Sequence, residues 1–386
     1  MQPQIATPTG LSPERDEEKL EVGGEVPPAT SVPPPRGSFL RRHGVKTVAS
    51  IVLAILFAWG LERAGLRLVP KAEQLRAVRW GWVAVHVALL MTIHVIRAVR
   101  WRHLLRPIAP EIGMRRVLAA SWLGFFAILM LPLRAGEIVR PWLIRDGKRV
   151  TMSAALGTMG AERVIDGLVV TGVLAGALLF VPRLDPLPRS IGELNIAVAT
   201  LPALGYGALA LFVAAFGAMA LFYFARDFAR RMVHATIGRV SERLGERVAG
   251  IVEGIASGLH FLGAPRYALP FLGETVAYWG INAVLMWTLG FACGLPMSFG
   301  HACAVEGVLA VGILVPAGPG LFGAFQAATF GALAMYFPPS VVMGPGSVYV
   351  FLLYTVQFVW HIVAAIIAAA LDPAMLRRGE QVVAGA

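Results

Sequence analysis

The stretches LPLRAGE at residues 131–137 and VPAGPGLFG at residues 315–323 each interrupt a long apolar run, and these two interruptions decide the fold. Proline removes a helix hydrogen bond and glycine frees the backbone, so each stretch predicts a break in a helix. Inside a bilayer such breaks persist only where protein or a water-filled cavity satisfies the freed backbone groups. The residues expected to break the helices are Pro132, Gly136, Pro316, Gly318, Pro319 and Gly320.

The composition around these breaks is that of a membrane protein. Apolar residues make up 57% of the 386 residues and charged residues only 15%, with a mean hydropathy of +0.68. Soluble domains carry about 25% charged residues. Runs of about 20 apolar residues can cross the bilayer as helices, so the sequence predicts an all-α integral membrane protein. The runs lie at residues 45–62, 79–96, 115–133, 151–182, 196–224, 267–294, 301–336 and 347–371.

The distribution of lysine and arginine predicts how these runs are threaded. If all eight runs cross the membrane, these residues divide almost evenly between its two sides. If runs 115–133 and 301–336 enter and leave by the same face, most of them gather on the side of the amino-terminal tail, as the positive-inside rule requires. We therefore expect about six full transmembrane helices plus two re-entrant or broken segments, in two halves of inverted topology. The alternative is that both broken runs are ordinary kinked spans.

The same reading predicts the organisation and location of the chain. The proline-rich, acidic stretch at residues 1–38 has a composition that cannot bury a core, so we expect it to be a disordered cytoplasmic tail. The basic segment after the fifth run has an apolar stripe at helical spacing, and it either lies on the anionic inner leaflet or packs as a link between the halves. We expect a multi-pass protein of the cytoplasmic (inner) membrane with both termini cytoplasmic. The expected divisions are a tail at 1–40, a first membrane half at 41–225, a basic amphipathic helix at 226–265, a second membrane half at 266–372 and a tail at 373–386.

The first group of candidate substrate-binding residues follows the first break. Arg134, Glu137 and Arg140 are spaced by three residues, so they share one face if the chain is helical. Two guanidiniums flanking a carboxylate could hold a phosphate, with the carboxylate orienting them or meeting a cationic headgroup. The alternative is that the arginines only snorkel to the cytoplasmic interface and set the topology.

Further ionisable residues lie within the apolar runs, where they are costly and therefore functional candidates. Glu162, Arg163 and Asp166 begin the fourth run, and an internal ion pair among them, with a structural role, is the simpler reading. Glu306 opens the seventh run and Gln326 follows the second break. Glu306 is a candidate for coupling or headgroup contact, against the alternative of a carboxylate exposed at the rim.

Motifs for catalysis, metals and nucleic acids are not found in the sequence. No Walker loop, GxSxG or HExxH is present, and Cys293 and Cys303 lie in apolar sequence without metal-ligand spacing. The net charge of +11 comes from lysines and arginines between the apolar runs, which predicts an orienting role rather than a nucleic-acid partner. We therefore expect no cofactor and no bound metal, and we find no catalytic motif that would make the chain an enzyme.

Three segments carry a resemblance to a known family. They are LPLRAGEIVRPWL at 131–143, ERVID at 162–166 and VPAGPGLFGAFQ at 315–326. In these segments the chain resembles the flippase-like family typified by the membrane region of lysylphosphatidylglycerol synthases, over about residues 45–371. The resemblance implies a role in lipid translocation or envelope lipid metabolism. The positions that match the family's polar residues are Arg134, Glu137, Arg140, Glu162, Arg163 and Asp166.

The chain departs from the family in two ways. Members that aminoacylate lipids carry a soluble transferase domain after the membrane region, whereas this sequence ends shortly after its last apolar run, so aminoacyl transfer is not implied. The family's second motif usually has a glutamate where this chain has Gln326, which puts in doubt a need for negative charge there.

These observations lead to one main functional hypothesis and two alternatives. The main one is a flippase or transporter that moves an anionic phospholipid or a lipid-linked envelope precursor between leaflets, with Arg134 and Arg140 contacting its phosphate. The first alternative is a membrane-embedded enzyme that uses Glu137, Glu162 or Asp166 as general acid or base on a lipid phosphate. The second is a non-transporting scaffold for a separate lipid-modifying enzyme.

Overall fold

The computed structural model separates the chain into two units, Met1–Ser38 and Phe39–Ala386, and every residue it describes belongs to the second. Throughout the described residues the regular secondary structure is helical, with no β-strand. The described residues are 68–131, 136–146, 149–188, 198–225, 242–315 and 319–375, with scattered positions between 52 and 63.

In the described part of the chain, five helices are long and apolar enough to cross a membrane. Each follows one of the predicted apolar runs, and together they confirm an all-α integral membrane protein. A helix rises about 1.5 Å per residue, so helices of 24 to 29 residues are longer than the hydrocarbon core of a bilayer is thick. The predicted first span, at 45–62, lies mostly outside the described residues. The five helices are α3 (Trp80–Leu105), α6 (Met152–Phe180), α7 (Leu201–Phe224), α10 (Pro265–Ala292) and α14 (Pro345–Leu371).

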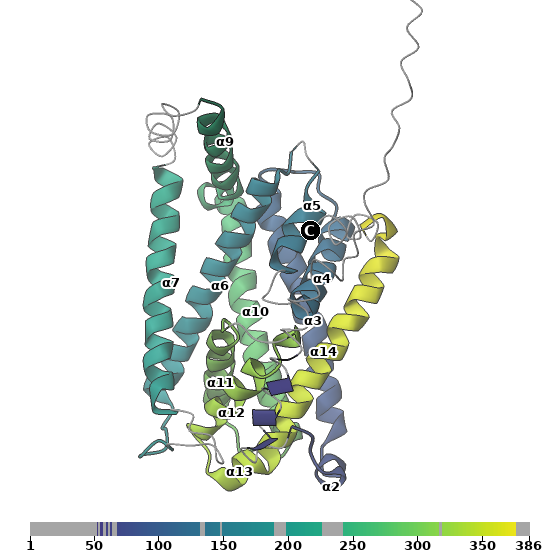
Figure 1. Ribbon diagram of the computed structural model, residues 1–386, viewed down its shortest axis with the longest axis vertical. Coiled ribbons are helices and arrows are strands. Elements are labelled where there is room, and N and C mark those ends of the chain that lie inside the picture. Colours follow the sequence, from purple (N-terminus) through teal and green to yellow (C-terminus); the bar gives the residue numbers. More distant parts are fainter. Residues whose placement is uncertain are drawn as a thin grey trace, which may run out of the picture. The chain divides into compact units, whose positions relative to one another are not determined.

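The third and seventh runs are broken, as predicted. The third forms α4 (Met114–Met130) and the short α5 (Val139–Ile144), and the seventh forms α11 (Phe299–Gly312) and α12 (Ala324–Ala334). Within each pair the second helix folds back and packs against the first. Each broken run is therefore a helical hairpin. Figure 1 shows α4 and α5 in the upper half of the bundle and α11 and α12 in the lower half.

Glycine makes both reversals possible. A Cβ atom on Gly136 would collide with the backbone of Ala127 and Ile128 in α4, so only glycine lets the returning chain lie this close. At the second break Gly320 and Gly323 have φ angles of 73° and 91°, which favour glycine. The Tyr354 hydroxyl donates a 3.1 Å hydrogen bond to the Gly320 carbonyl and ties this turn to α14. Pro132, Pro316 and Gly318 lie outside the described residues.

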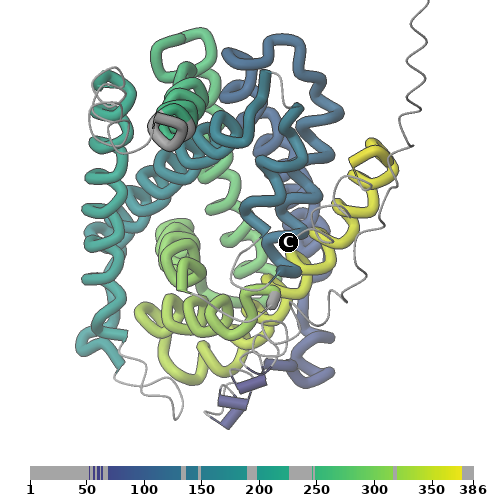
Figure 2. Tube along the Cα trace, turned by 45° about the horizontal axis from the view of Figure 1, so that its top comes forward, coloured from purple at the N-terminus to yellow at the C-terminus, as the bar shows by residue number. Residues whose placement is uncertain are grey.

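The helix contacts repeat between the two halves. Helices α3 and α10 pack along each other, α4 packs along α14, and α11 packs along α6. If the two predicted halves are exchanged, α4 takes the place of α11 and α14 that of α6, so the last two contacts would be equivalent. In the same way, α3 meets α4 as α10 meets α11. In Figure 2, α14, in yellow, runs beside the blue α4.

The basic segment that joins the halves is described from residue 242 onward, and it packs on the bundle. Helix α9 (Glu242–Gly258) lies on the first part of α6, where a Cβ on Gly157 would come within 2.6 Å of the Ile255 carbonyl oxygen. This contact favours the packed alternative for that part. The remaining short elements are α2 (Ala72–Arg76), η2 (Val198–Thr200), η3 (His260–Gly263), η4 (Pro319–Leu321) and α13 (Pro339–Met343).

The hairpins predict a specific labelling pattern in a background in which Cys293 and Cys303 are replaced by alanine. Cysteines replacing Glu111 and Arg145, on the two sides of the first hairpin, should react with a membrane-impermeant thiol reagent from the same side of the membrane. Cysteines replacing Pro296 and Ser340, on the two sides of the second hairpin, should react from the other side.

All four positions are exposed, so failure to react is not expected from burial. Reaction of the Glu111→Cys and Arg145→Cys variants from opposite sides would show that α4 and α5 cross the membrane.

Candidate functional site

The charged residues of α6 lie within its first half, and its two acids are on the face that meets the other helices. Glu162 is fully buried and Asp166, one turn later, is 6% exposed. Ionised side chains this deep in a membrane helix are costly unless they are paired. Each carboxylate has an arginine partner, and the two arginines come from different helices.

Glu162 pairs with Arg140 of α5. Arg140 Nη1 donates a 2.9 Å hydrogen bond to Glu162 Oε1, and Nη2 lies 2.9 Å from Oε2 outside hydrogen-bond geometry. The guanidinium also lies over the Trp101 ring, 4.0 Å from its centroid, so a cation–π contact adds to the ion pair. Gly124 of α4 makes this placement possible, because a Cβ there would lie 2.5 Å from the Arg140 Cβ.

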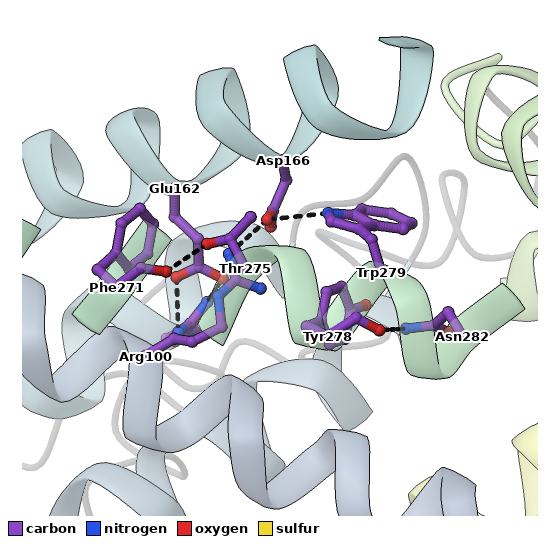
Figure 3. Close-up of polar contacts among 9 residues, drawn as sticks. Arg100, Glu162, Asp166, Phe271, Thr275, Tyr278, Trp279 and Asn282 are labelled. Carbon is purple, nitrogen blue, oxygen red and sulfur yellow. Dashed lines mark hydrogen bonds and ion pairs between the residues drawn. The ribbon is translucent and has the colours of Figure 1, made fainter. Parts of the chain in front are cut away.

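Asp166 pairs with Arg100 of α3. Arg100 Nη2 donates to Asp166 Oδ1, and Trp279 Nε1 of α10 donates to the same oxygen at 3.2 Å. The Arg100 guanidinium lies 4.9 Å from the centroid of the Tyr278 ring. Figure 3 shows these side chains converging from three helices. One carboxylate therefore joins α3, α6 and α10.

Two further arginines at this level have no ion pair with any described residue. Arg97 of α3 lies over the Phe125 ring, 3.5 Å from its centroid, and Arg163 follows Glu162 on α6. The two lie within electrostatic reach of each other and of Glu162. Both are only partly buried, whereas Arg100 and Arg140 are fully buried. The paired arginines are thus enclosed by protein, whereas the side chains of the unpaired ones are partly exposed at the protein surface.

We call these six residues the arginine cluster. Four guanidiniums face two carboxylates, so the cluster carries two uncompensated positive charges. A further anion, in addition to the two carboxylates, would reduce the electrostatic cost of that excess. The members of the cluster are Arg97, Arg100, Arg140, Glu162, Arg163 and Asp166.

The predicted site residues are only partly brought together. Arg140, Glu162, Arg163 and Asp166 belong to the cluster, but the expected ion pair within residues 162–166 is wrong. Both carboxylates pair with arginines on other helices instead, Glu162 with Arg140 and Asp166 with Arg100. Glu137 lies half-buried in the 3₁₀ turn that precedes α5. Arg134 lies outside the described residues.

The two candidates of the second hairpin lie apart from these four. Gln326 is buried, and its Oε1 accepts a 2.8 Å hydrogen bond from the Gly323 backbone, which caps α12. Glu306 is 3% exposed, so it is not the rim-exposed carboxylate of the alternative. Neither of its carboxylate oxygens has a hydrogen-bond partner among the residues that the structure describes.

Arg97 and Arg100 are absent from the predicted site because the second apolar run was ended at residue 96. Charges beyond the end of a predicted run are expected to lie in a loop and to orient the protein. Helix α3 continues to Leu105, and Ala98, Trp101 and Leu105 are buried along its final turns. In the sequence, Ala98, Trp101 and Leu105 follow one another at helical spacing. This pattern indicates that the helix continues past residue 96.

A family model confirms the resemblance seen in the sequence. The model described as "Lysylphosphatidylglycerol synthase TM region" matches residues 46–370. The chain belongs to this family. The match covers both hairpins and all six residues of the arginine cluster, so the cluster lies within the part of the chain that defines this transmembrane-region family. No curated protein and no solved structure matches the chain.

The paired arrangement predicts how single and double replacements affect stability. Glu162→Gln leaves Arg140 buried beside a neutral amide, and breaking a buried pair typically costs about 3–5 kcal/mol. Adding Arg140→Met removes the stranded charge and should recover most of the loss. The apparent melting temperature of the purified protein in detergent measures both effects.

Arg149→Gln serves as the control, because Arg149 forms a solvent-exposed pair with Glu111 at 3.6 Å and such pairs contribute about 0–1 kcal/mol. A double variant no more stable than Glu162→Gln contradicts the account of this pair.

Proposed function

We propose that the protein moves an anionic phospholipid, or a lipid-linked envelope precursor, between the two leaflets of the cytoplasmic membrane. The observation that carries this proposal is the pair of arginines, Arg97 and Arg163, that lack ion-pair partners among the described residues while lying between membrane helices. Membership of the family supports a membrane function that involves lipids. The anionic substrate and its translocation are the proposal.

The chemistry of the cluster favours a phosphate-bearing headgroup. Guanidinium groups bind phosphate with charge-assisted, often bidentate hydrogen bonds. Arg100 and Arg140 are already occupied by Asp166 and Glu162, so we assign them the role of positioning α3 and α5 against α6. Phosphate contact then falls to Arg97 and Arg163. This assignment places the phosphate at Arg97 and Arg163, whereas the sequence alone predicts phosphate contact at Arg134 and Arg140.

Arg97 has the position that a transport pathway requires. It lies against Phe125 of α4 and 5.7 Å from the centroid of the Tyr278 ring of α10, and His361 of α14 lies within its electrostatic reach. A headgroup at Arg97 would therefore contact helices of both halves. Substrate sites of transporters built from inverted repeats lie at such an interface between halves.

The proposed mechanism uses the two hairpins as opposing gates. We propose that α4–α5 re-enters from the cytoplasmic face and α11–α12 from the opposite face, with six crossings and both termini in the cytoplasm. The equivalent packing of α4 on α14 and α11 on α6 supports this inverted arrangement. Movement of one hairpin at a time would expose the arginine cluster to one leaflet and then to the other. Glu137, in the turn at the first break, would then lie at the membrane-buried tip of the first hairpin.

The proposal predicts loss of lipid movement when the unpaired arginines are removed. Arg97→Gln and Arg163→Gln should each slow the flipping of fluorescent phosphatidylglycerol in proteoliposomes about tenfold or more, since a charge-assisted hydrogen bond contributes about 1.5–3 kcal/mol. Dithionite quenching of the outer-leaflet label measures the rate. Phosphatidylcholine with the same label should move more slowly through the wild-type protein.

Arg266→Gln is the matched control, because Arg266 is exposed and lies over Tyr267 away from the cluster. Equal flipping by wild type and both cluster variants contradicts the proposal. Chemical change of the labelled lipid without movement supports a membrane-embedded enzyme instead. The absence of both movement and chemical change supports a scaffold for a separate lipid-modifying enzyme.

A further inference from the structure

Glu306 is a buried carboxylate that the arginine cluster does not use. It lies in α11, and both of its oxygens are buried without a hydrogen-bond donor. The other acidic side chains in the described membrane helices have at least one partner: Glu162 and Asp166 pair with arginines, and Glu274 meets His103 at 3.2 Å. Glu306 is therefore chemically different from every other acid in these helices.

Among the described residues, no positively charged group contributes to the electrostatic surroundings of Glu306. Helix α11 packs against α6, α7, α10 and α12, and next to Glu306 the residue Gly307 meets Leu174 of α6. The titratable groups within electrostatic reach of Glu306 are Tyr278 of α10, Tyr349 of α14 and Cys303 of α11 itself. None of these carries a positive charge, and the Tyr349 hydroxyl is engaged with Met286 Sδ at 3.2 Å. An ionised carboxylate is strongly disfavoured in such a place.

Tyr278 links Glu306 to the arginine cluster electrostatically. The tyrosine lies within electrostatic reach of Arg97, Arg100 and Asp166 on one side and of Glu306 on the other. A headgroup bound at Arg97 would lie beside the same tyrosine, because the Arg97 guanidinium is 5.7 Å from the centroid of the Tyr278 ring. We therefore expect the charge of the headgroup and that of Glu306 to act on each other, and linkage makes such coupling reciprocal. A negative headgroup and an ionised Glu306 repel each other. Binding of the headgroup therefore favours the protonated form of Glu306.

We propose that Glu306 is a proton-binding site coupled to the arginine cluster, so that one proton moves with each anionic lipid. This inference rests on the proposed function. Glu306 takes a proton from water on the side to which the α11–α12 hairpin is open, and returns it to water on the other side. A proton moving with a singly charged phospholipid carries no net charge, so the coupled step responds to a pH gradient and not to the membrane potential.

Proteoliposomes that contain labelled phosphatidylglycerol test this coupling. With a pH difference of one unit across wild-type vesicles, the label should accumulate in the leaflet on the alkaline side, up to about tenfold for one-to-one coupling. The Glu306→Gln variant keeps the size and neutrality of the protonated acid and should give equal leaflet populations with or without the gradient. Glu274→Gln replaces an acid that already has a partner, His103, and this variant should behave like the wild type.

A second measurement covers the possibility that Glu306→Gln moves no lipid. Adding short-chain phosphatidylglycerol to the detergent-solubilised wild type, in weakly buffered solution at a pH alkaline enough to ionise Glu306, should cause proton uptake, reported by a pH-sensitive dye. The Glu306→Gln variant should bind the same lipid without proton uptake, and short-chain phosphatidylcholine should cause none in either protein.

The outcomes separate the two proposals. Wild-type protein that moves no lipid under any gradient overturns the proposed function and this inference with it. Wild-type protein that moves lipid with equal leaflet populations under the gradient overturns the proton site alone. Proton uptake by Glu306→Gln equal to that of wild type also overturns the proton site alone.

Discussion

The ion pairs that Glu162 and Asp166 form with arginines on other helices are the interactions on which the rest of the structure depends. Lipid gives a buried carboxylate no water to replace a missing partner, so each acid of α6 constrains another helix. Arg140 fixes α5, and therefore the return of the first hairpin, while Arg100 and Trp279 fix α3 and α10. The same pairs occupy two guanidiniums, and within the arginine cluster they leave Arg97 and Arg163 without an ion pair to a described residue.

The hairpins follow from a second constraint, which is the cost of an unsatisfied backbone in lipid. A break within a membrane segment must be enclosed by protein, and small residues permit the required approach. Gly136 lies against the backbone of α4, and the positive φ angles at Gly320 and Gly323 allow the second turn, which Gln326 and Tyr354 then hold by hydrogen bonds. The residues that form these turns belong to the two hairpins, which are the moving elements of the proposed mechanism.

The membrane fold was largely predictable from the sequence, and the candidate site only in part. Apolar runs, proline and glycine are local signals, so five spans, both breaks and the family could be predicted. Ion pairing is a tertiary property, and the sequence could not show that Glu162 reaches Arg140 rather than Arg163. Arg97 and Arg100 were missed because charges near the end of an apolar run also occur as topological signals. Glu306 was identified as a candidate, but its lack of a partner could be seen only in the packed structure.

The most direct test of the central claim is a cryo-electron microscopy structure of the protein in nanodiscs that contain phosphatidylglycerol. The account predicts a lipid phosphate between the helices, at about 2.7–2.9 Å from guanidinium nitrogens of Arg97 and Arg163, with the pairs at Glu162 and Asp166 intact. A structure in which Arg97 and Arg163 are paired with carboxylates of the protein, and every lipid lies outside the helices, would contradict it.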